Sequence, residues 1–295
     1  MRALRIHRYG GPEELLLENI SFPVPGKGQL LLKVSAASVN PIDWKMRRGM
    51  LAGMFPLTFP RTLGRYCAGE VDGRLYAGVA DMRTDGTHAE FALLPENQCS
   101  QVPQGLDAAA AASLCVAGLS AYIPLVEFAA LKKDQKILIH AGAGGVGSLA
   151  LQIARHVGAE VHATASAANR DYCLSLGASL VIDYRNERFQ ENFYDAVLDT
   201  IGGETHRRSL SALKPGGILV ALAAAPIPQG AQRPDVRVVM AQIQPTRERL
   251  EKIFQWAASG ILRPQVTRRF GLEEGAAAYT ASESGHGRGK IVLEL

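Results

Sequence analysis

The chain has 295 residues, of which 47% are hydrophobic and 20% charged, a composition typical of a globular protein rather than a disordered or fibrous one. The formal net charge of +4 is small for this length, and no basic run argues for a nucleic-acid partner. We expect two domains at this length. We find no signal peptide and no stretch of about 18 uninterrupted apolar residues, so we expect no membrane partner.

The first hundred residues predict a lobe of short β-strands. Strand-like runs at residues 30–34 and 90–94 are separated by many prolines and glycines, which interrupt helices and favour turns. Between them, a short helix is expected at residues 44–48, with Asp43 as its N-terminal cap.

From residue 107 onward, helical and strand-like segments alternate, which predicts a parallel sheet covered by helices on both faces. The expected helices are 108–131, 148–157, 168–176, 204–213 and 247–259, and the expected strands are 136–140, 160–165, 180–182, 194–199 and 218–222. The tail returns to strand-like runs at 265–270 and 290–295, which we expect to rejoin the first lobe.

A glycine-rich turn lies between the strand at 136–140 and the helix that follows it. Gly142, Gly144 and Gly147 satisfy G-x-G-x-x-G, which permits a tight turn and a close backbone approach to a pyrophosphate. Unpaired amides and the positive end of the helix dipole then face the anion. We therefore predict a dinucleotide site that includes Gly145 and Val146, together with Leu222 at the end of the strand 218–222.

The end of the next strand indicates which dinucleotide is bound. An NAD site is expected to carry Asp or Glu there for the ribose 2′-hydroxyl, and neither residue is present. Ser166 and Arg170 follow instead, and a guanidinium forms two parallel hydrogen bonds with a phosphate. With Tyr184 closing the pocket, NADPH fits better than NADH. The alternative is that Arg170 is only a solvated residue at a helix start.

Six segments together resemble the medium-chain dehydrogenase/reductase superfamily, specifically its zinc-free NADPH:quinone oxidoreductase branch. They are SVNPIDWKMRRG at 38–49, AGLSAY at 117–122, AGAGGVG at 141–147, LGASLVIDYR at 176–185, LKPGGILV at 213–220 and GRGKIVL at 287–293. The resemblance implies an α/β fold in which a Rossmann doubly wound parallel sheet, residues 114–261, is inserted into a GroES-like β-rich catalytic lobe, residues 1–113 completed by 262–295. It also implies hydride transfer from NADPH to quinones or α,β-unsaturated carbonyls, places Ser120 on the nicotinamide side of the cofactor, and is compatible with a homodimer.

Zinc-bearing relatives hold a catalytic metal at positions that correspond here to Asn40, Arg65 and approximately Val116. None of these side chains suits zinc, which prefers thiolate, imidazole or carboxylate. The four cysteines, Cys67, Cys99, Cys115 and Cys173, have no C-x-x-C spacing and are interpreted as free thiols in a reducing, cytoplasmic compartment. We therefore predict no metal.

Three residues are candidates for catalysis. Asn40 offers an amide donor to the acceptor carbonyl, although it also suits the start of the turn into Pro41. Arg65 offers a cation to the oxygen that gains negative charge, unless it serves only in an ion pair. A tyrosine often found just after the R-x-G segment of related reductases is missing, so solvent, Tyr66 or the cofactor ribose must supply the proton.

Two further functions remain open from the sequence. The segment between Gly69 and Phe91 is shorter than is usual in the family, which leaves an NADPH-binding protein with little or no turnover as an alternative. An S-adenosylmethionine methyltransferase also uses a glycine-rich first turn, but the N-terminal β lobe argues against it.

Overall fold

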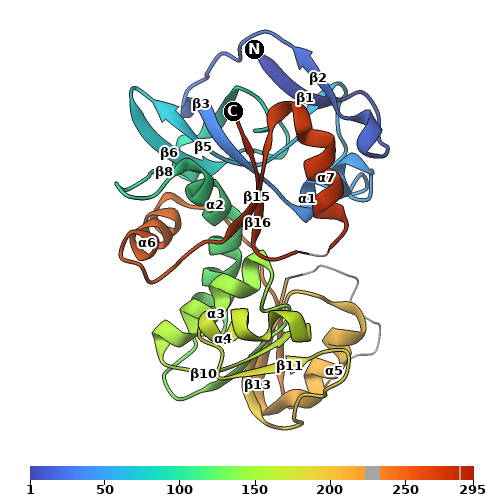
Figure 1. Cartoon of the computed structure of the whole chain (residues 1–295), viewed down its shortest axis with the longest axis vertical. Helices are drawn as coiled ribbons and strands as arrows, with labels where there is room; N and C mark the ends of the chain where they lie inside the picture. Colours follow the sequence, from blue (N-terminus) through green and yellow to red (C-terminus); the bar gives the residue numbers. More distant parts are fainter. Residues whose placement is uncertain (223–232, 286) are drawn as a thin grey trace. The chain divides into compact units, whose positions relative to one another are not determined.

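The computed structural model describes residues 1–222, 233–285 and 287–295. The chain folds into two compact units (Figure 1). Unit 1 comprises residues 1–116, 245–259 and 264–295, and unit 2 comprises residues 117–244 and 260–263. The helix α2, Ala108–Tyr122, crosses the division between them.

Unit 1 is built on two β-sheets. The smaller sheet has the order β2-β1-β4, and the larger has the order β15-β16-β3-β5-β6-β8, with β7 also paired to β3. Their strands are β1 Arg2–Ile6, β2 Leu16–Asn19, β3 Gln29–Val39, β4 Arg61–Thr62, β5 Tyr66–Val71, β6 Arg74–Val79, β7 Phe91–Pro95, β8 Cys99–Gln101, β15 Val266–Gly271 and β16 Lys290–Glu294. The helices are α1 Pro41–Arg47, α6 Arg247–Ala258 and α7 Gly275–Glu283.

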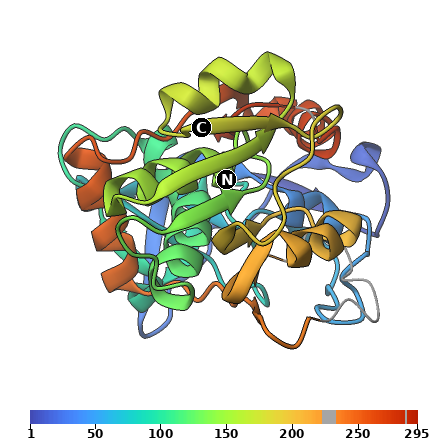
Figure 2. The same cartoon turned by 90° about the horizontal axis from the view of Figure 1, so that it is seen from below.

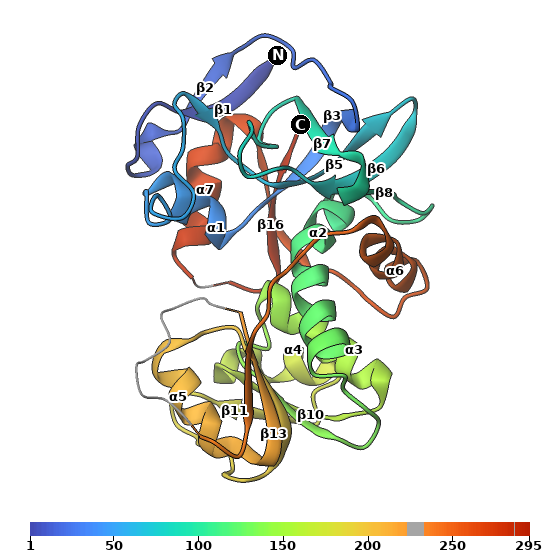
Figure 3. The same ribbon diagram turned by 180° about the vertical axis from the view of Figure 1, so that it is seen from behind.

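The C-terminal tail completes the larger sheet of unit 1. Strand β16 pairs antiparallel with β3, in a register that sets Ile291 opposite Val39 and Leu293 opposite Ala37. Figure 3 shows the dark-red β16 beside the blue β3. Val39 and Leu293 are buried in one apolar cluster with Leu4 and Tyr279, so this core joins residues from both ends of the chain.

Unit 2 contains a six-stranded parallel sheet of order β11-β10-β9-β12-β13-β14 (Figure 2). The strands are β9 Lys136–Ile139, β10 Glu160–Ala165, β11 Leu180–Asp183, β12 Tyr194–Asp199, β13 Leu213–Ala221 and β14 Arg237–Met240, and the helices are α3 Gly145–Val157, α4 Arg170–Ser175 and α5 Gly203–Ala212. The direction of winding reverses between β9 and β12. Right-handed crossovers therefore place α3 and α4 on one face and α5 on the other, the doubly wound arrangement that the sequence predicts.

The strands of this sheet lie where uninterrupted apolar runs predict them. Residues 137–139 and 196–198 are buried, as expected for strands covered on both faces. Full burial of an aliphatic side chain such as Leu138 contributes about 1.5–3 kcal/mol. Helix α3 then ends at Gly158, whose φ of +89° is a conformation that glycine adopts without strain.

The expected helix at 108–131 is wrong in its second half. α2 ends at Tyr122, and a π-helix follows at Ile123–Phe128. Pro124 lacks the N–H that an α-helical hydrogen bond requires, and its carbonyl accepts from the Ala129 N–H at 2.9 Å, five residues later. By length and composition, residues 108–128 are also apolar enough to cross a membrane, but 78% of the relevant window is buried inside the protein, as in a core helix.

Helix α6 groups with unit 1, and its expected place in the nucleotide-binding domain, residues 114–261, is wrong. Its first residue, Arg247, donates from Nη2 to the carbonyl of Glu96 at 2.8 Å and from Nε to that of Cys99 at 3.3 Å. Its apolar side, with Leu250 and Phe254, is buried. The sequence reveals this amphipathic face but not which sheet it covers.

Candidate active site

The glycine-rich turn follows β9 and leads directly into α3. The Gly144 N–H donates to the carbonyl of Ala141 at 2.9 Å, and Gly144 is the N-cap of the helix. The amides of Gly145, Val146 and Gly147 occupy the first three helical positions, where no preceding helical turn supplies a carbonyl to accept from them. The turn therefore presents N–H donors at the positive end of a helix dipole, which suits an anion.

Two glycines are required by close packing in this turn. A Cβ at Gly147 would lie 2.1 Å from the backbone oxygen of Ala141, and one at Gly142 would lie 2.8 Å from Cβ of Ala163 on β10. No side chain fits in either place without moving the backbone or the neighbouring strand. These residues fit a dinucleotide pyrophosphate, and they would hold its phosphates through backbone amides.

A series of buried hydrogen bonds that the sequence patterns do not reveal supports the turn. His140 Nδ1 lies 3.0 Å from Thr164 Oγ1, which accepts from the Ala141 N–H at 3.2 Å. His140 Nε2 lies 2.8 Å from Ser209 Oγ, whose proton is donated to the carbonyl of Thr205 at 2.6 Å. Nε2 therefore donates to Ser209. Burial lowers the pKa of the ring to about 4, so His140 is neutral near pH 7 and its Nδ1 accepts from the Thr164 hydroxyl. These hydrogen bonds hold Ala141 in its conformation with a positive φ of 50°.

Several predicted cofactor residues lie at one edge of the parallel sheet. Ser166 follows β10, Tyr184 follows β11 and Leu222 follows β13, so all three stand at the carboxyl ends of parallel strands, as the glycine turn does. Ser166 is half-buried and Tyr184 is exposed. Ser120 belongs to the part of α2 in unit 2 and is mostly buried. The structure brings the first three together with the turn, at the usual ligand edge of such a sheet.

Arg170 is the first residue of α4, and its guanidinium is already bonded to other residues of the protein. Its Nη1 donates to the carbonyl of Val181 at 2.6 Å, and its Nη2 pairs with Glu187 at 2.9 Å. The other oxygen of Glu187 accepts from the Asp183 N–H at 2.8 Å. The guanidinium is therefore held beside β11, but a phosphate binding there must share it with a carboxylate.

In unit 1, Asn40 follows the last residue of β3 and is the N-cap of α1. Its Nδ2 donates to the carbonyl of Ser38 at 2.9 Å and lies 3.1 Å from Ser38 Oγ, and its Oδ1 accepts from the ammonium of Lys290. The expected cap at Asp43 is wrong, because the helix begins at Pro41 and Asn40 is its N-cap. Asp43 is the third helical residue and completes a capping box, in which its Oδ2 accepts from the Asn40 N–H at 2.7 Å. With both amide hydrogens in use and the side chain buried, Asn40 has no free donor for an acceptor carbonyl unless these bonds break.

Asp43 and Lys290 are two buried ionisable groups beside Asn40. Burial raises the pKa of Asp43 to about 7, against the opposing effects of the Asn40 N–H and the nearby Lys290 and Arg65 charges. Burial likewise lowers the pKa of Lys290 to about 8. The sequence contains Lys290 only as part of GRGKIVL, and nothing in the pattern indicates that it bonds a residue 250 positions away.

Arg65 and Tyr66 lie next to this cluster. The Arg65 guanidinium lies 5.6 Å from the centre of the Tyr66 ring, and Nη2 is 3.4 Å from the carbonyl of Ala80. In the part of the chain that the structure describes, no carboxylate lies within 4.0 Å of Arg65. Burial raises the pKa of Tyr66 above its ordinary value, so the phenol keeps its proton at neutral pH.

Comparison with known proteins places both units in known families. Residues 26–74 match the alcohol dehydrogenase GroES-like domain, and residues 176–293 match a family described as zinc-binding dehydrogenase. The chain is 35% identical to an NADPH-dependent alkenal/one oxidoreductase of Arabidopsis thaliana, over 99% of this chain and 79% of that protein. It is 30% identical to a chloroplastic quinone-oxidoreductase homologue of Spinacia oleracea, over 100% of this chain and 98% of that protein.

A solved structure matches the whole chain as well. The quinone oxidoreductase from Coxiella burnetii is 32% identical, with a TM-score of 0.92, and the match covers 100% of this chain and 99% of that one. The chain belongs to the medium-chain dehydrogenase/reductase superfamily, in its zinc-free quinone oxidoreductase branch. The family and fold predicted from the sequence are thereby confirmed.

The zinc suggested by one of the matched family descriptions does not fit the residues present. At the positions where zinc-bearing relatives have metal ligands, Asn40 has its oxygen bonded to Lys290, and Arg65 is a cation. A guanidinium does not ligate zinc, and zinc seldom takes an amide oxygen in place of thiolate or imidazole. We therefore derive no catalytic step from zinc.

The Asp43→Asn variant is expected to gain stability relative to the wild type as the pH rises from about 4 to about 7, by on the order of 3 kcal/mol. The folded-state pKa of about 7 exceeds the value of about 3.9 in an unfolded chain, so native Asp43 binds more protons in this interval and wild-type stability falls as pH rises. Urea unfolding of both proteins across this pH range measures the difference in their free energies of unfolding. The contributions of the other titrating groups are the same in both proteins and cancel in this difference. A pH-independent difference would contradict the prediction.

Proposed function

We propose that this protein is an NADPH-dependent reductase that delivers hydride, without zinc, to an α,β-unsaturated carbonyl compound or a quinone. The observation that carries the proposal is the turn at residues 141–147. Backbone atoms fill the space that a side chain at Gly147 would need, and the three amides at the start of the helix remain available to a phosphate. The names of the matched relatives support the acceptor class. They also disfavour the alternative of a nucleotide-binding protein without turnover, since they are names of oxidoreductases.

The residues of unit 1 support reduction of a conjugated acceptor. Bound NADPH supplies the hydride, and the acceptor oxygen then gains negative charge. Arg65 offers a half-buried cation with no carboxylate partner in the described residues, and such a group stabilises that charge more in the transition state than in the neutral substrate. Tyr66 retains its phenolic proton and is the protein group we propose for protonating the product.

Single-turnover kinetics test this function directly. The protein is loaded with NADPH, mixed rapidly with benzoquinone or with ethylideneacetone, and followed by nicotinamide absorbance. We expect oxidation of the cofactor by at least one acceptor class, and the same rate after dialysis against a chelator. NADPH that binds but is oxidised by neither acceptor would reject the proposal.

Arg170→Ala is expected to weaken NADPH binding about tenfold while leaving NADH binding nearly unchanged, because a charge-assisted phosphate contact contributes about 1.5–3 kcal/mol. Glu187→Gln is the matched variant. It removes the carboxylate that competes for Arg170 and is expected to tighten NADPH binding. Cofactor titrations of the three proteins measure both effects, and equal wild-type affinity for NADPH and NADH would contradict the assignment.

We also propose a homodimer formed through β14. This strand is at the edge of the six-stranded sheet, and its Val238 and Met240 side chains are each 42% exposed. Among the described residues, the outer edge of β14 has no partner strand, and an edge with exposed apolar side chains is a site where a second copy can add its own strand. Four buried free cysteines support a reducing compartment, and the buried helix at 108–128 and low net charge give no support to a membrane or nucleic-acid partner.

A further inference from the structure

Two loops of unit 2 lie at the point where the winding of its sheet reverses. One is the glycine turn after β9, and the other is the loop 200–202 between β12 and α5. They are joined directly, because the His140 N–H donates to the Leu198 carbonyl at 3.1 Å and the Thr200 hydroxyl donates to the His140 carbonyl at 3.0 Å. Ligands of doubly wound sheets bind at this point, outside the carboxyl ends of the strands. The loop 200–202 therefore borders the predicted cofactor site on the side of β12.

The nicotinamide half of the cofactor is expected on this side. Ser166 and Arg170, which we assign to the 2′-phosphate of the adenosine half, follow β10, on the other side of β9 from β12. The pyrophosphate lies between them, at the glycine turn. A dinucleotide that spans the turn extends its nicotinamide half toward the loop 200–202. Ile201 of this loop is 41% exposed and offers an apolar contact there.

A buried carboxylate holds the backbone of this loop. Asp199 is the last residue of β12 and is fully buried. Its Oδ1 accepts from the N–H groups of Ile201 and Gly202, both at 2.9 Å. Gly202 has φ +79° and ψ −161°, a combination that only glycine adopts readily, so the loop bends sharply at this residue. The conformation of the loop thus depends on where the Asp199 carboxylate lies.

His206 in turn fixes that carboxylate. Its Nδ1 lies 3.0 Å from Asp199 Oδ2, and because a carboxylate only accepts, Nδ1 donates. His206 belongs to α5 and is 1% exposed, so neither member of the pair can touch a cofactor. Burying such a pair costs desolvation free energy that two apolar side chains avoid, which indicates a role other than packing.

We propose that Asp199 and His206 are positioning residues that hold the loop 200–202 in contact with the nicotinamide half of NADPH. The proposal rests on the reductase function above and adds a part of its site that the sequence patterns leave unassigned. Asp199 fixes the backbone of the loop, His206 fixes the carboxylate, and the exposed side chain of Ile201 packs against the bound cofactor. A displaced loop weakens the binding of NADPH but not that of a ligand without the nicotinamide half.

Adenosine 2′,5′-bisphosphate is the probe that tests this difference, because it has the adenosine half and the 2′-phosphate of NADPH but no nicotinamide. In His206→Leu, calorimetric titration is expected to show about tenfold weaker binding of NADPH and a change of less than about twofold for the bisphosphate. His206→Asn should restore most of the NADPH affinity, since its amide nitrogen is bonded to Cγ, as Nδ1 of histidine is, and can donate to Asp199.

Ile201→Ala tests the contact itself. The side chain is exposed, so the variant should fold as the wild type does. We expect NADPH to bind about three- to tenfold more weakly, because apolar area that the cofactor covers is lost, and the bisphosphate to bind as before.

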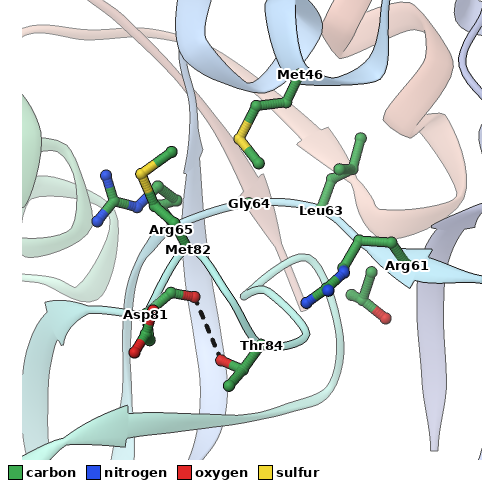
Figure 4. A pocket seen from close by; sticks show the side chains of 9 residues that line it. Met46, Arg61, Leu63, Gly64, Arg65, Asp81, Met82 and Thr84 are labelled. Atoms are coloured by element: carbon green, nitrogen blue, oxygen red, sulfur yellow. Dashed lines mark hydrogen bonds between the residues drawn. The ribbon is translucent and has the colours of Figure 1, made fainter. Parts of the chain in front are cut away.

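Asp199→Ala and Asp81→Ala form a matched pair of variants. At both positions the carboxylate accepts from the N–H two residues later at 2.9 Å, Ile201 in one case and Arg83 in the other. Asp81, however, is an exposed residue of unit 1, on the loop after β6, where its carbonyl accepts from the Thr84 hydroxyl (Figure 4). Asp199→Ala should weaken the binding of NADPH alone, and Asp81→Ala should change neither affinity.

Thermal unfolding of each variant separates positioning from folding. If His206 served only the fold, His206→Leu would melt at a lower temperature and bind both ligands as the wild type does, which would overturn the proposal. An equal loss of affinity for NADPH and the bisphosphate in His206→Leu and Ile201→Ala would overturn it as well. A wild-type protein that binds no NADPH would instead reject the reductase function on which the proposal rests.

Discussion

Gly147→Ala is expected to weaken NADPH binding by about a hundredfold or more, because two lost charge-assisted hydrogen bonds cost about 3–6 kcal/mol. The new Cβ would lie 2.1 Å from the carbonyl oxygen and 2.8 Å from the carbonyl carbon of Ala141. Both are backbone atoms, so the turn itself must move. That movement displaces the helix-start amides that we assign to the phosphates.

Fluorescence titration with NADPH and thermal unfolding measure this effect together. Gly53→Ala serves as the control, since a Cβ there meets nothing within 4 Å, and it should bind NADPH as the wild type does. Because the helix α3 and its buried residues lie next to the turn, a lower melting temperature is expected for Gly147→Ala as well. Wild-type affinity and melting temperature in Gly147→Ala would refute the assigned role of the turn.

Arg65→Met is expected to lower turnover by roughly ten- to a thousandfold with little change in NADPH affinity. The guanidinium is half-buried, lies above the Tyr66 ring, and has no ion-pair partner among the described residues, so its charge is available to an acceptor oxygen. Loss of a contact made mainly in the transition state lowers kcat without changing cofactor binding. Steady-state kinetics with saturating NADPH, alongside cofactor titration, separate the two quantities.

Arg65→Lys tests whether charge alone is sufficient. A lysine keeps the positive charge but not the planar fork, so partial recovery of turnover is expected relative to Arg65→Met. Methionine retains most of the side-chain volume, which limits the loss of packing against Tyr66. A correctly folded Arg65→Met variant with wild-type turnover would show that Arg65 is structural.

Local sequence patterns predicted the nucleotide-binding sheet well and other parts poorly. β10 and β12 have the predicted bounds, because each is a short segment with valine and alanine that follows a helix or loop and is visible without knowledge of the fold. Helix α7, Gly275–Glu283, was missed, since its alanine-rich sequence has little amphipathic periodicity. β14 was missed as well, because its four residues carry no turn or periodic signal strong enough to mark a strand.

The sequence by itself determined the glycine turn, the parallel sheet around it and the family, since each depends on residues that are neighbours along the chain. Only the tertiary structure decided which side chains remain available for chemistry. It showed that Asn40 is bonded to Lys290, that Arg170 is paired with Glu187, and that Arg65 has no carboxylate within 4.0 Å among the described residues. These contacts join residues far apart in sequence, and whether a polar group is free depends on every partner that folding brings to it.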